Sequence, residues 1–286
     1  TFAILYVLII LVIVTGASSG IGAETAIEFS KLDTKVVLTG RNKENLNSVA
    51  KRCKDESPNN FEPKVIIADM NKEVDVENII KETIEHFGQI DVLVNNAGIL
   101  ESGSIENTSL DVYYLTMLAT PHLIKTKGNI VNISSLAGLR SFPGFLSYCM
   151  SKAALDQFTR CVSLELAPKG IRVNSVNPGV IVTDIHRRMG MSETEYKEYL
   201  EQCKEVHPLG RVGTPDEVAS AIVFLASDGA SNITGATLPI DGGRQAARLH
   251  ILCLVLFANS KITRILDKIL ILARILTVWS GLVAWN

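Results

Sequence analysis

The sequence predicts an α/β fold in which a doubly wound parallel sheet lies between two layers of helices. Short runs rich in valine and isoleucine alternate with segments of helical hydrophobic period. A glycine-rich turn follows the first apolar run directly. No internal repeat, low-complexity stretch or interdomain linker interrupts this alternation, so residues 1–246 are expected to form a single domain. From residue 247 the composition turns apolar, and residues 247–286 are expected to form an atypical helical tail of unknown role.

Composition argues against several classes of function. The 286 residues are 47% apolar, which is enough for a sizeable core, and the net charge of −2 provides no basic field for nucleic acid. The five cysteines have no paired CxxC spacing, which suits a reducing compartment and argues against structural zinc. The five histidines form no HExxH motif, so no metal site is predicted.

The first strand is expected at the end of the apolar run from Phe2 to Val14, which is too short to span a bilayer. It leads into Thr15-Gly-Ala-Ser-Ser-Gly-Ile-Gly22 and then into a helix. Glycines at 16, 20 and 22 allow a tight turn and a close approach of the backbone to a pyrophosphate, which would rest on the helix N-terminus. The turn therefore predicts a Rossmann-type dinucleotide site.

The remaining elements follow in alternation. Pro121 is expected to interrupt the helix before the fifth strand. The expected helices cover residues 21–31, 42–54, 74–87, 110–125, 147–168 and 215–226, and the further strands cover residues 35–39, 64–68, 90–94, 130–133, 171–176 and 238–240.

Tyr148 and Lys152 are candidates for proton transfer. They are four residues apart, so on a helix they share one face. A neighbouring ammonium favours the phenolate, and we expect Lys152 to lower the pKa of Tyr148 toward working pH. Ser135, at the end of the preceding strand, can hold a substrate oxygen by a hydrogen bond. Taken alone, the pair favours an ordinary helix surface, because such pairs are common.

The end of the second strand bears on the cofactor. NAD-binding proteins of this fold usually place an acid there to bind the ribose 2′-hydroxyl. This chain has Gly40 followed by Arg41, which favours a 2′-phosphate and therefore NADP over NAD. The alternative is that Arg41 is a solvated loop cation.

Two later segments bear on the site and the fold. Asn177-Pro-Gly-Val-Ile-Val-Thr183 forms a loop at the carboxyl end of a strand, where open α/β sheets bind ligands. The polar segment 186–207 that follows is either a lid over a substrate or a solvated helical excursion, and its position favours the lid. Thr214-Pro-Asp-Glu217 is a capping box that begins the next helix.

The tail has an apolar helical stripe interrupted by Lys261, Arg264, Lys268 and Arg274. A helix that packs on the domain or a partner, a helix at a membrane surface, and a segment that does not fold all remain open, while a spanning helix is disfavoured. There is no cleavable signal peptide and no retention or peroxisomal address, so the cytoplasm is the expected location and membrane association is the alternative.

Four motifs in the same order resemble the classical short-chain dehydrogenase/reductases. These motifs are the glycine turn ending at Gly22, Asn95-Asn-Ala-Gly98, Ser135 placed thirteen residues before Tyr148-x-x-x-Lys152, and Asn177-Pro-Gly179 followed by Thr183. The resemblance covers about Val12 to Gly243 and extends to 3-oxoacyl-acyl-carrier-protein reductases. It implies hydride transfer between NADP(H) and a small-molecule carbonyl or alcohol, such as a 3-oxoacyl thioester, small ketone, sugar or steroid.

The resemblance also implies roles for individual residues. Tyr148 would be the general acid/base, Lys152 would lower its pKa and bind the nicotinamide ribose, and Ser135 would orient the carbonyl. Together with Arg41 from the end of the second strand, the residues expected to bind the cofactor are Gly16, Ser18, Ser19, Gly20, Ile21, Gly22, Asp69, Asn96, Ala97, Gly98, Tyr148, Lys152, Pro178, Gly179, Ile181 and Thr183.

The chain departs from the family pattern between Gly98 and the fifth strand. The first half of the helix expected there is missing, which is a loss of about a dozen residues or several helical turns. That helix usually bears an asparagine of a proton relay, near the positions of Thr108 and Ser109, and helps to form dimers. The expectation is an active reductase, with a homo-oligomer left open. The alternative is a catalytically impaired member that binds nucleotide or a partner without turnover.

Overall fold

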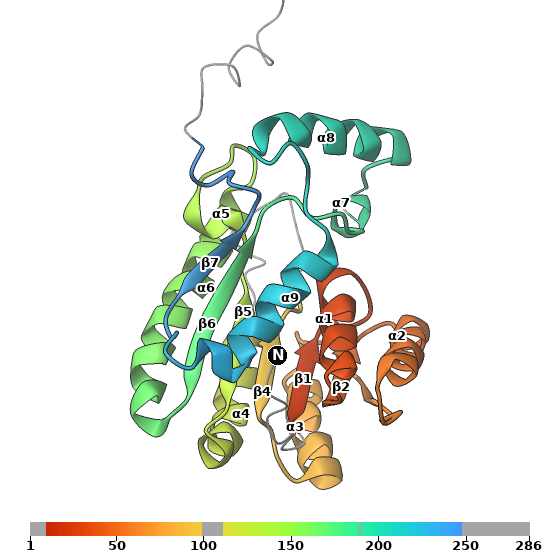
Figure 1. Ribbon diagram of the computed structural model, residues 1–286, viewed down its shortest axis with the longest axis vertical. Helices are drawn as coiled ribbons and strands as arrows, with labels where there is room; N and C mark the ends of the chain where they lie inside the picture. Colours follow the sequence, from red (N-terminus) through yellow and green to blue (C-terminus); the bar gives the residue numbers. More distant parts are fainter. Residues whose placement is uncertain (1–9, 99–110, 189, 248–286) are drawn as a thin grey trace, which may run out of the picture. The chain divides into compact units, whose positions relative to one another are not determined.

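The computed structural model describes residues 10–98, 111–188 and 190–247. Within them, parallel strands form one sheet in the order β3-β2-β1-β4-β5-β6-β7 (Figure 1). The predicted doubly wound fold is thereby confirmed. The strands are β1 Leu11–Thr15, β2 Lys35–Gly40, β3 Lys64–Ile67, β4 Val92–Asn95, β5 Asn129–Ile133, β6 Arg172–Pro178 and β7 Thr237–Ile240.

Helices cover both faces of this sheet. The apolar side chains of α1, α2 and α9 pack on one face, and those of α3, α4 and α6 pack on the other. The helices are α1 Gly20–Lys31, α2 Lys43–Glu56, α3 Glu73–Phe87, α4 Asp111–Thr126, α5 Leu136–Leu139, α6 Leu146–Leu166, α7 Ile185–Arg188, α8 Glu193–Val206 and α9 Pro215–Ala226.

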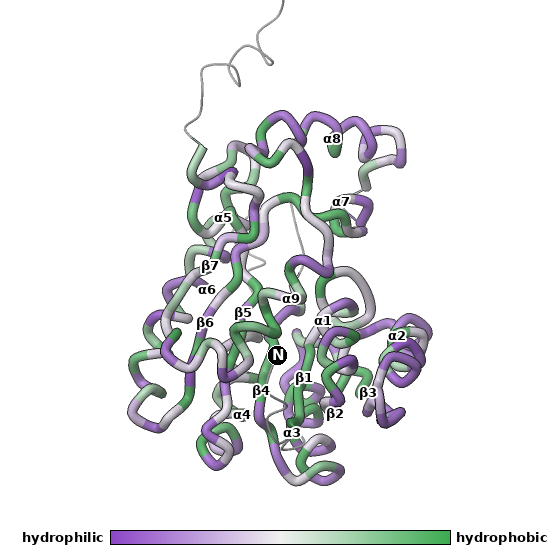
Figure 2. The backbone as a smooth tube through the Cα atoms, in the orientation of Figure 1, coloured by the Kyte–Doolittle hydropathy of each residue, from purple (hydrophilic) through white to green (hydrophobic). Residues whose placement is uncertain are grey.

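The core lies along both faces of the central strands. In β1, Val12 and Val14 point to one apolar cluster, while Leu11 and Ile13 point to the other. Successive residues of a strand face opposite sides, so a strand covered on both faces must be apolar throughout. Figure 2 shows this apolar run in the central strands and a largely hydrophilic α2. The first strand was therefore predictable from its unbroken apolar sequence.

The order of strands reverses between β1 and β4. The chain passes from β1 outward to β3, returns to pair β4 with β1, and continues outward to β7. At such a switch point the loops after the two strands diverge, and a crevice opens beyond their carboxyl ends. The loops that follow β1 and β4 carry two of the predicted motifs.

Helix α4 differs from the expectation for Pro121. The helix runs from Asp111 to Thr126 with Pro121 inside it, so the predicted interruption is wrong. Pro121 and Met117, whose carbonyl loses its helical partner, both lie on the exposed side, where water can reach that carbonyl. Residues 99–110, including Thr108 and Ser109, lie outside the described residues.

The segment 186–207 contains two helices rather than one. The short α7 ends at Arg188, and α8 begins behind the capping box of Ser192 and Glu195. Helix α9 begins at the predicted capping box, in which Glu217 accepts a hydrogen bond from the main-chain N–H of Thr214. Helix α5 was not predicted, because its four residues are too few to show a period.

Within the described ranges, no helix has the length and apolar character needed to cross a membrane. The same residues contain no cluster of three or more His, Cys, Asp or Glu side chains suited to hold a metal ion. The expected N-terminal overhang and the proposed roles of the tail lie outside the described residues.

Candidate active site

The glycine turn between β1 and α1 is packed too closely to admit side chains. A Cβ on Gly22 would lie 2.4 Å from Nδ2 of Asn96 and 2.5 Å from the carbonyl oxygen of Gly16. A Cβ on Gly16 would lie 2.9 Å from the Cα of Ala97, and its φ of +63° favours glycine. The turn therefore exposes main-chain N–H groups at the start of α1, which fits a diphosphate.

The turn after β1 and the turn after β4 are joined by hydrogen bonds. Nδ2 of Asn96 donates to the carbonyl oxygen of Thr15 at 2.8 Å, and the main-chain N–H groups of Asn96 and Ala97 both donate to Oγ1 of Thr15 at 2.9 Å. This places Asn96 between the two turns. The predicted motifs at 15–22 and 95–98 thus form one structural unit.

The loops after β2 and β3 extend this edge of the sheet. Gly40, which ends β2, lies beside Ser18, so that a Cβ on Gly40 would be 3.7 Å from the serine Oγ. Arg41 follows and is exposed. Asp69 follows β3, where its main-chain N–H donates to Asp75 at 2.9 Å. Ser18 and Arg41 are thus placed at neighbouring strand ends, as the sequence predicted.

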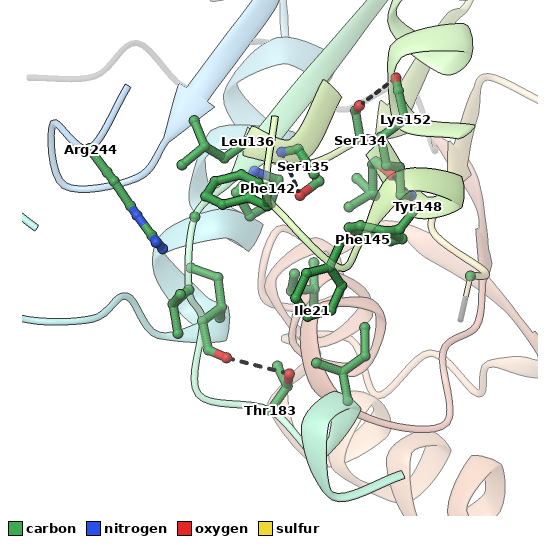
Figure 3. Close-up of a pocket in the computed structure, with 18 of the residues that line it drawn as sticks. Ile21, Ser134, Ser135, Leu136, Phe142, Phe145, Tyr148, Lys152, Thr183 and Arg244 are labelled. Carbon is green, nitrogen blue, oxygen red and sulfur yellow. Dashed lines mark hydrogen bonds between the residues drawn. The ribbon is translucent and has the colours of Figure 1, made fainter. Parts of the chain in front are cut away.

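Tyr148 and Lys152 lie one turn apart on α6, as their spacing predicted. The Nζ of Lys152 donates to the carbonyl oxygen of Ile133 at 2.9 Å and lies 5.8 Å from the centre of the Tyr148 ring. Ser135 follows β5, and its Oγ accepts from the main-chain N–H of Ala137 at 3.1 Å. In Figure 3 the side chains of Ser135, Tyr148 and Lys152 are grouped at one end of the cavity.

The predicted direction of the Tyr148 pKa is wrong for this structure. Burial raises the pKa of the Tyr148 phenol, and a hydrogen bond with Ser135 opposes that rise. Burial lowers the pKa of Lys152 to about 8, and the charge of Asp156 opposes this. The ammonium of Lys152 faces the Tyr148 ring and the Ile133 carbonyl, so it does not lower the pKa of the phenol as the spacing suggested.

A buried carboxylate beneath the site was not predicted. Asp156 is 1% exposed, and its two oxygens accept hydrogen bonds from Nδ2 of Asn177 at 3.1 and 2.9 Å. The same Nδ2 donates to the carbonyl oxygen of Ser135 at 3.0 Å. Asp156 follows Lys152 by four residues, and that spacing was the available signal. The network ties α6 to the ends of β5 and β6.

The loop after β6 reaches over the glycine turn. A Cβ on Gly20 would lie 3.2 Å from the Thr183 side chain. Farther along the loop, the guanidinium of Arg188 donates a hydrogen bond to Oγ of Ser19, the residue that precedes α1. The hydroxyl of Tyr196, on α8, donates to the carbonyl oxygen of Thr183 at 3.0 Å. Helices α7 and α8 therefore contact the expected cofactor loop, as a lid would.

One cavity gathers most of the predicted side chains at the carboxyl ends of the strands. The predicted residues that line it are Ile21, Asn96, Gly98, Ser135, Tyr148, Lys152, Pro178, Gly179, Ile181 and Thr183. Others stay outside its lining, namely Gly16, Ser18, Ser19, Gly20, Gly22, Arg41, Asp69 and Ala97. Lining residues that sequence reasoning missed include Leu136, Phe142, Phe145, Ile185, Tyr199 and Arg244. The missed residues come largely from α5, the loop before α6, α8 and the segment after β7.

Residues 16–245 match the family described as Enoyl-(Acyl carrier protein) reductase. This match spans the glycine turn, the Tyr148–Lys152 pair and the loop after β6. The chain belongs to the short-chain dehydrogenase/reductase family. It is accordingly a member of an oxidoreductase family.

Several relatives in this family are named for different activities. A meso-2,3-butanediol dehydrogenase of Serratia marcescens is 37% identical over 82% of this chain and 94% of its own length. An L-xylulose reductase of Caenorhabditis elegans is 39% identical over 81% of this chain and 94% of its own length. A 3-oxoacyl-[acyl-carrier-protein] reductase of Thermotoga maritima is 36% identical over 81% of this chain and 96% of its own length. The resemblance to 3-oxoacyl reductases is thereby confirmed as a similarity within the family.

Solved short-chain dehydrogenase/reductase structures share the fold. One from Caenorhabditis elegans, of unknown function and with bound cofactor, has a TM-score of 0.78 and 34% identity, covering 84% of this chain and 96% of that chain. The L-sorbose reductase of Gluconobacter frateurii, in complex with NADPH and L-sorbose, has a TM-score of 0.77 and 26% identity. The match covers 83% of this chain and 97% of that chain. The second of these structures thus holds a nicotinamide cofactor within the same fold.

Proposed function

We propose that this chain is an NADP(H)-dependent reductase of a small carbonyl compound, with Tyr148 as general acid/base. The observation that carries the proposal is the single cavity that joins Tyr148, Lys152 and Ser135 to Asn96, Gly179 and Thr183. When bound, the nicotinamide supplies or accepts the hydride.

The residues of the chain would supply orientation and a proton. The Ser135 hydroxyl donates to the substrate carbonyl oxygen and fixes its position. The Tyr148 hydroxyl then gives its proton to that oxygen as the carbonyl carbon is reduced. Because burial raises the pKa of Tyr148, its phenol stays protonated at neutral pH, which suits this direction of reaction. Lys152 would hold the nicotinamide ribose.

We test the proposal by following NADPH oxidation with small ketones, sugars and short 3-oxoacyl thioesters. Tyr148→Phe keeps the ring but removes the proton donor, so we expect turnover to fall about 100-fold or more. Tyr113→Phe is the matched control, because Tyr113 is an exposed tyrosine on α4. Undiminished turnover in Tyr148→Phe would refute the role of Tyr148. The relatives and the described residues give no support to the alternative of an impaired member.

The preference for NADP is proposed from Arg41. Arg41 is exposed and follows Gly40, which lies beside Ser18, and among the described residues it forms no ion pair. A guanidinium there pairs well with a 2′-phosphate. We expect Arg41→Ala to weaken NADPH binding about tenfold or more while leaving NADH binding nearly unchanged, as measured by cofactor fluorescence. Lys43→Ala, on the exposed start of α2, controls for the lost charge; equal weakening of both cofactors would contradict the assignment.

The chain is proposed to act in the cytoplasm on a small-molecule substrate, without nucleic acid. Contact of the tail with a membrane surface and assembly into a homo-oligomer stay predictions. Measuring sedimentation of the full chain, with and without lipid vesicles, tests both.

A further inference from the structure

The cavity has two charged side chains along its lining, and both are cations. Lys152 lies at the reacting end, held to the carbonyl oxygen of Ile133. Arg244, from the segment after β7, lines the same cavity. In Figure 3, Arg244 and Tyr148 lie on opposite sides of Phe142. The described residues that line the cavity include no Asp or Glu, so both charges along it are positive, and the apolar ring of Phe142 lies between Arg244 and Tyr148.

Arg244 is held in place by its main chain. Its N–H donates to the carbonyl oxygen of Asp241 at 3.1 Å, and its own carbonyl oxygen accepts from the guanidinium of Arg140. Its guanidinium carbon lies 5.2 Å from the centre of the Phe142 ring. The side chain is half-buried and not extended freely into solvent. Its position is therefore set by the fold.

The charge of Arg244 has no carboxylate partner among the described residues. The ion pairs in this part of the chain use other arginines, such as Arg187 with Asp184 and Glu193, and Arg211 with Glu217. The nearby Asp241 accepts instead from the main-chain N–H groups of Gly243 and Gln245. A partly buried guanidinium gains most from a planar anion that fits its fork of donors.

We propose that the substrate carries a carboxylate at the end remote from its reacting carbonyl, and that Arg244 binds this carboxylate. The inference rests on the proposed reductase function. Phe142, Phe145 and Leu136 line the cavity along with these two cations and fit an apolar spacer between the two polar groups. The substrate class is then a free oxo acid, with the corresponding hydroxy acid as product. In a thioester linked to a carrier, the carrier's phosphate would take the place of the carboxylate at Arg244.

The test compares linear oxo acids with their methyl esters, using pairs in which the separation of carbonyl and carboxylate increases stepwise. At the matching separation, we expect kcat/KM for the acid to exceed that for the ester about 10- to 100-fold. Arg244→Gln is expected to bring this ratio close to one, and Arg244→Lys to leave an intermediate ratio because it keeps the charge but loses the fork. Arg160→Gln, on the exposed face of α6, is the control for net charge and keeps the ratio.

Binding provides a second measurement that does not require turnover. Oxo acids and their methyl esters are titrated calorimetrically into the wild-type protein loaded with NADP⁺, a pair that cannot exchange hydride, so the result stands even if the variants fail to fold. Equal affinity of acid and ester at every separation overturns the proposal. A preference for coenzyme A thioesters over thioesters of a small neutral thiol, with none for free acids, also overturns it. Turnover of neutral ketones that is lost in Tyr148→Phe shows that the reductase function holds in that case.

Discussion

At the scale of single residues, burial controls the charges of Tyr148 and Lys152. The phenol is kept neutral and the ammonium is made easier to deprotonate, because the cavity disfavours both charged forms. The negative charge of Asp156 opposes the lowering of the Lys152 pKa. The oxygens of Asp156 accept hydrogen bonds from Asn177. The pKa of Lys152 therefore depends on a carboxylate that does not line the cavity.

This arrangement predicts the pH dependence of Lys152. Its ammonium should titrate near pH 8 in the folded protein, against 10.5 for the ordinary side chain. Since the unfolded chain binds this proton more tightly, the contribution of Lys152 to stability rises from about pH 8 to 10.5. Reduction should slow over the same rise in pH because the ammonium is lost. Carbon NMR of labelled lysine, assigned with Lys152→Arg, gives the midpoint.

Asp156→Asn provides the matched variant for this titration. Removing the carboxylate removes the charge that raises the Lys152 pKa, so the midpoint should move below that of the wild type. A midpoint in the wild type close to the ordinary lysine value would show that burial does not govern this group.

At the scale of elements, α7 contacts the glycine turn and α8 contacts the loop after β6. Arg187 is held by Asp184 and Glu193 and lies 4.2 Å from the centre of the Tyr196 ring, so it ties α7 to α8. Arg188, the next residue, instead reaches Ser19 at the start of α1. A guanidinium at that position would face the cofactor diphosphate. The two adjacent arginines thus have different tasks.

We expect Arg188→Ala to weaken binding of NADPH about three- to tenfold, because one exposed charge-assisted contact is lost. Binding of adenosine 2′-monophosphate, which has no phosphate at the 5′ position, should be unaffected. Lys197→Ala, on exposed α8, is the control. Fluorescence titration of the cofactor and calorimetry of the fragment measure the two affinities. An equal loss for both ligands would place Arg188 away from the diphosphate.

The helices, the strands and most of the loops at the carboxyl edge of the sheet were predictable, because each of these segments depends on its local sequence. The apolar β1, the glycine turn and the capping box of Thr214 and Glu217 show their structure in adjacent residues. Arg244 could not be found in this way, because β7 must pair with β6 before the segment after it reaches the cavity. The pKa of Tyr148 also depended on burial, which the spacing to Lys152 does not reveal.

At the scale of the whole molecule, the cofactor turn is part of the core. The residues described up to Gln245 belong to one compact unit, and the turn around Gly22 lies where its two central strands meet. Asn96 closes this junction through hydrogen bonds to Thr15 and Gly16. Changes in the turn should therefore affect both stability and binding.

Gly22→Ala tests this coupling. The added methyl group would overlap Asn96 and the Gly16 carbonyl, so we expect the free energy of unfolding to fall by about 1–3 kcal/mol, together with NADPH affinity. Gly40→Ala is the control for stability, because its Cβ would meet only ordinary contacts at 3.7 Å or more. Denaturant titration measures both variants. A Gly22→Ala protein as stable as Gly40→Ala would show that the junction adjusts freely.

The central place of β1 also has a consequence for synthesis on the ribosome. β1 can pair with β2 soon after both emerge, but its other edge stays open until β4 and Asn96 have left the exit tunnel. The nascent chain thus carries an unpaired apolar strand edge while the residues between are translated. Slow codons just after Asn96 would give this junction time to close, and a dinucleotide already present could stabilise it before the catalytic helix is made.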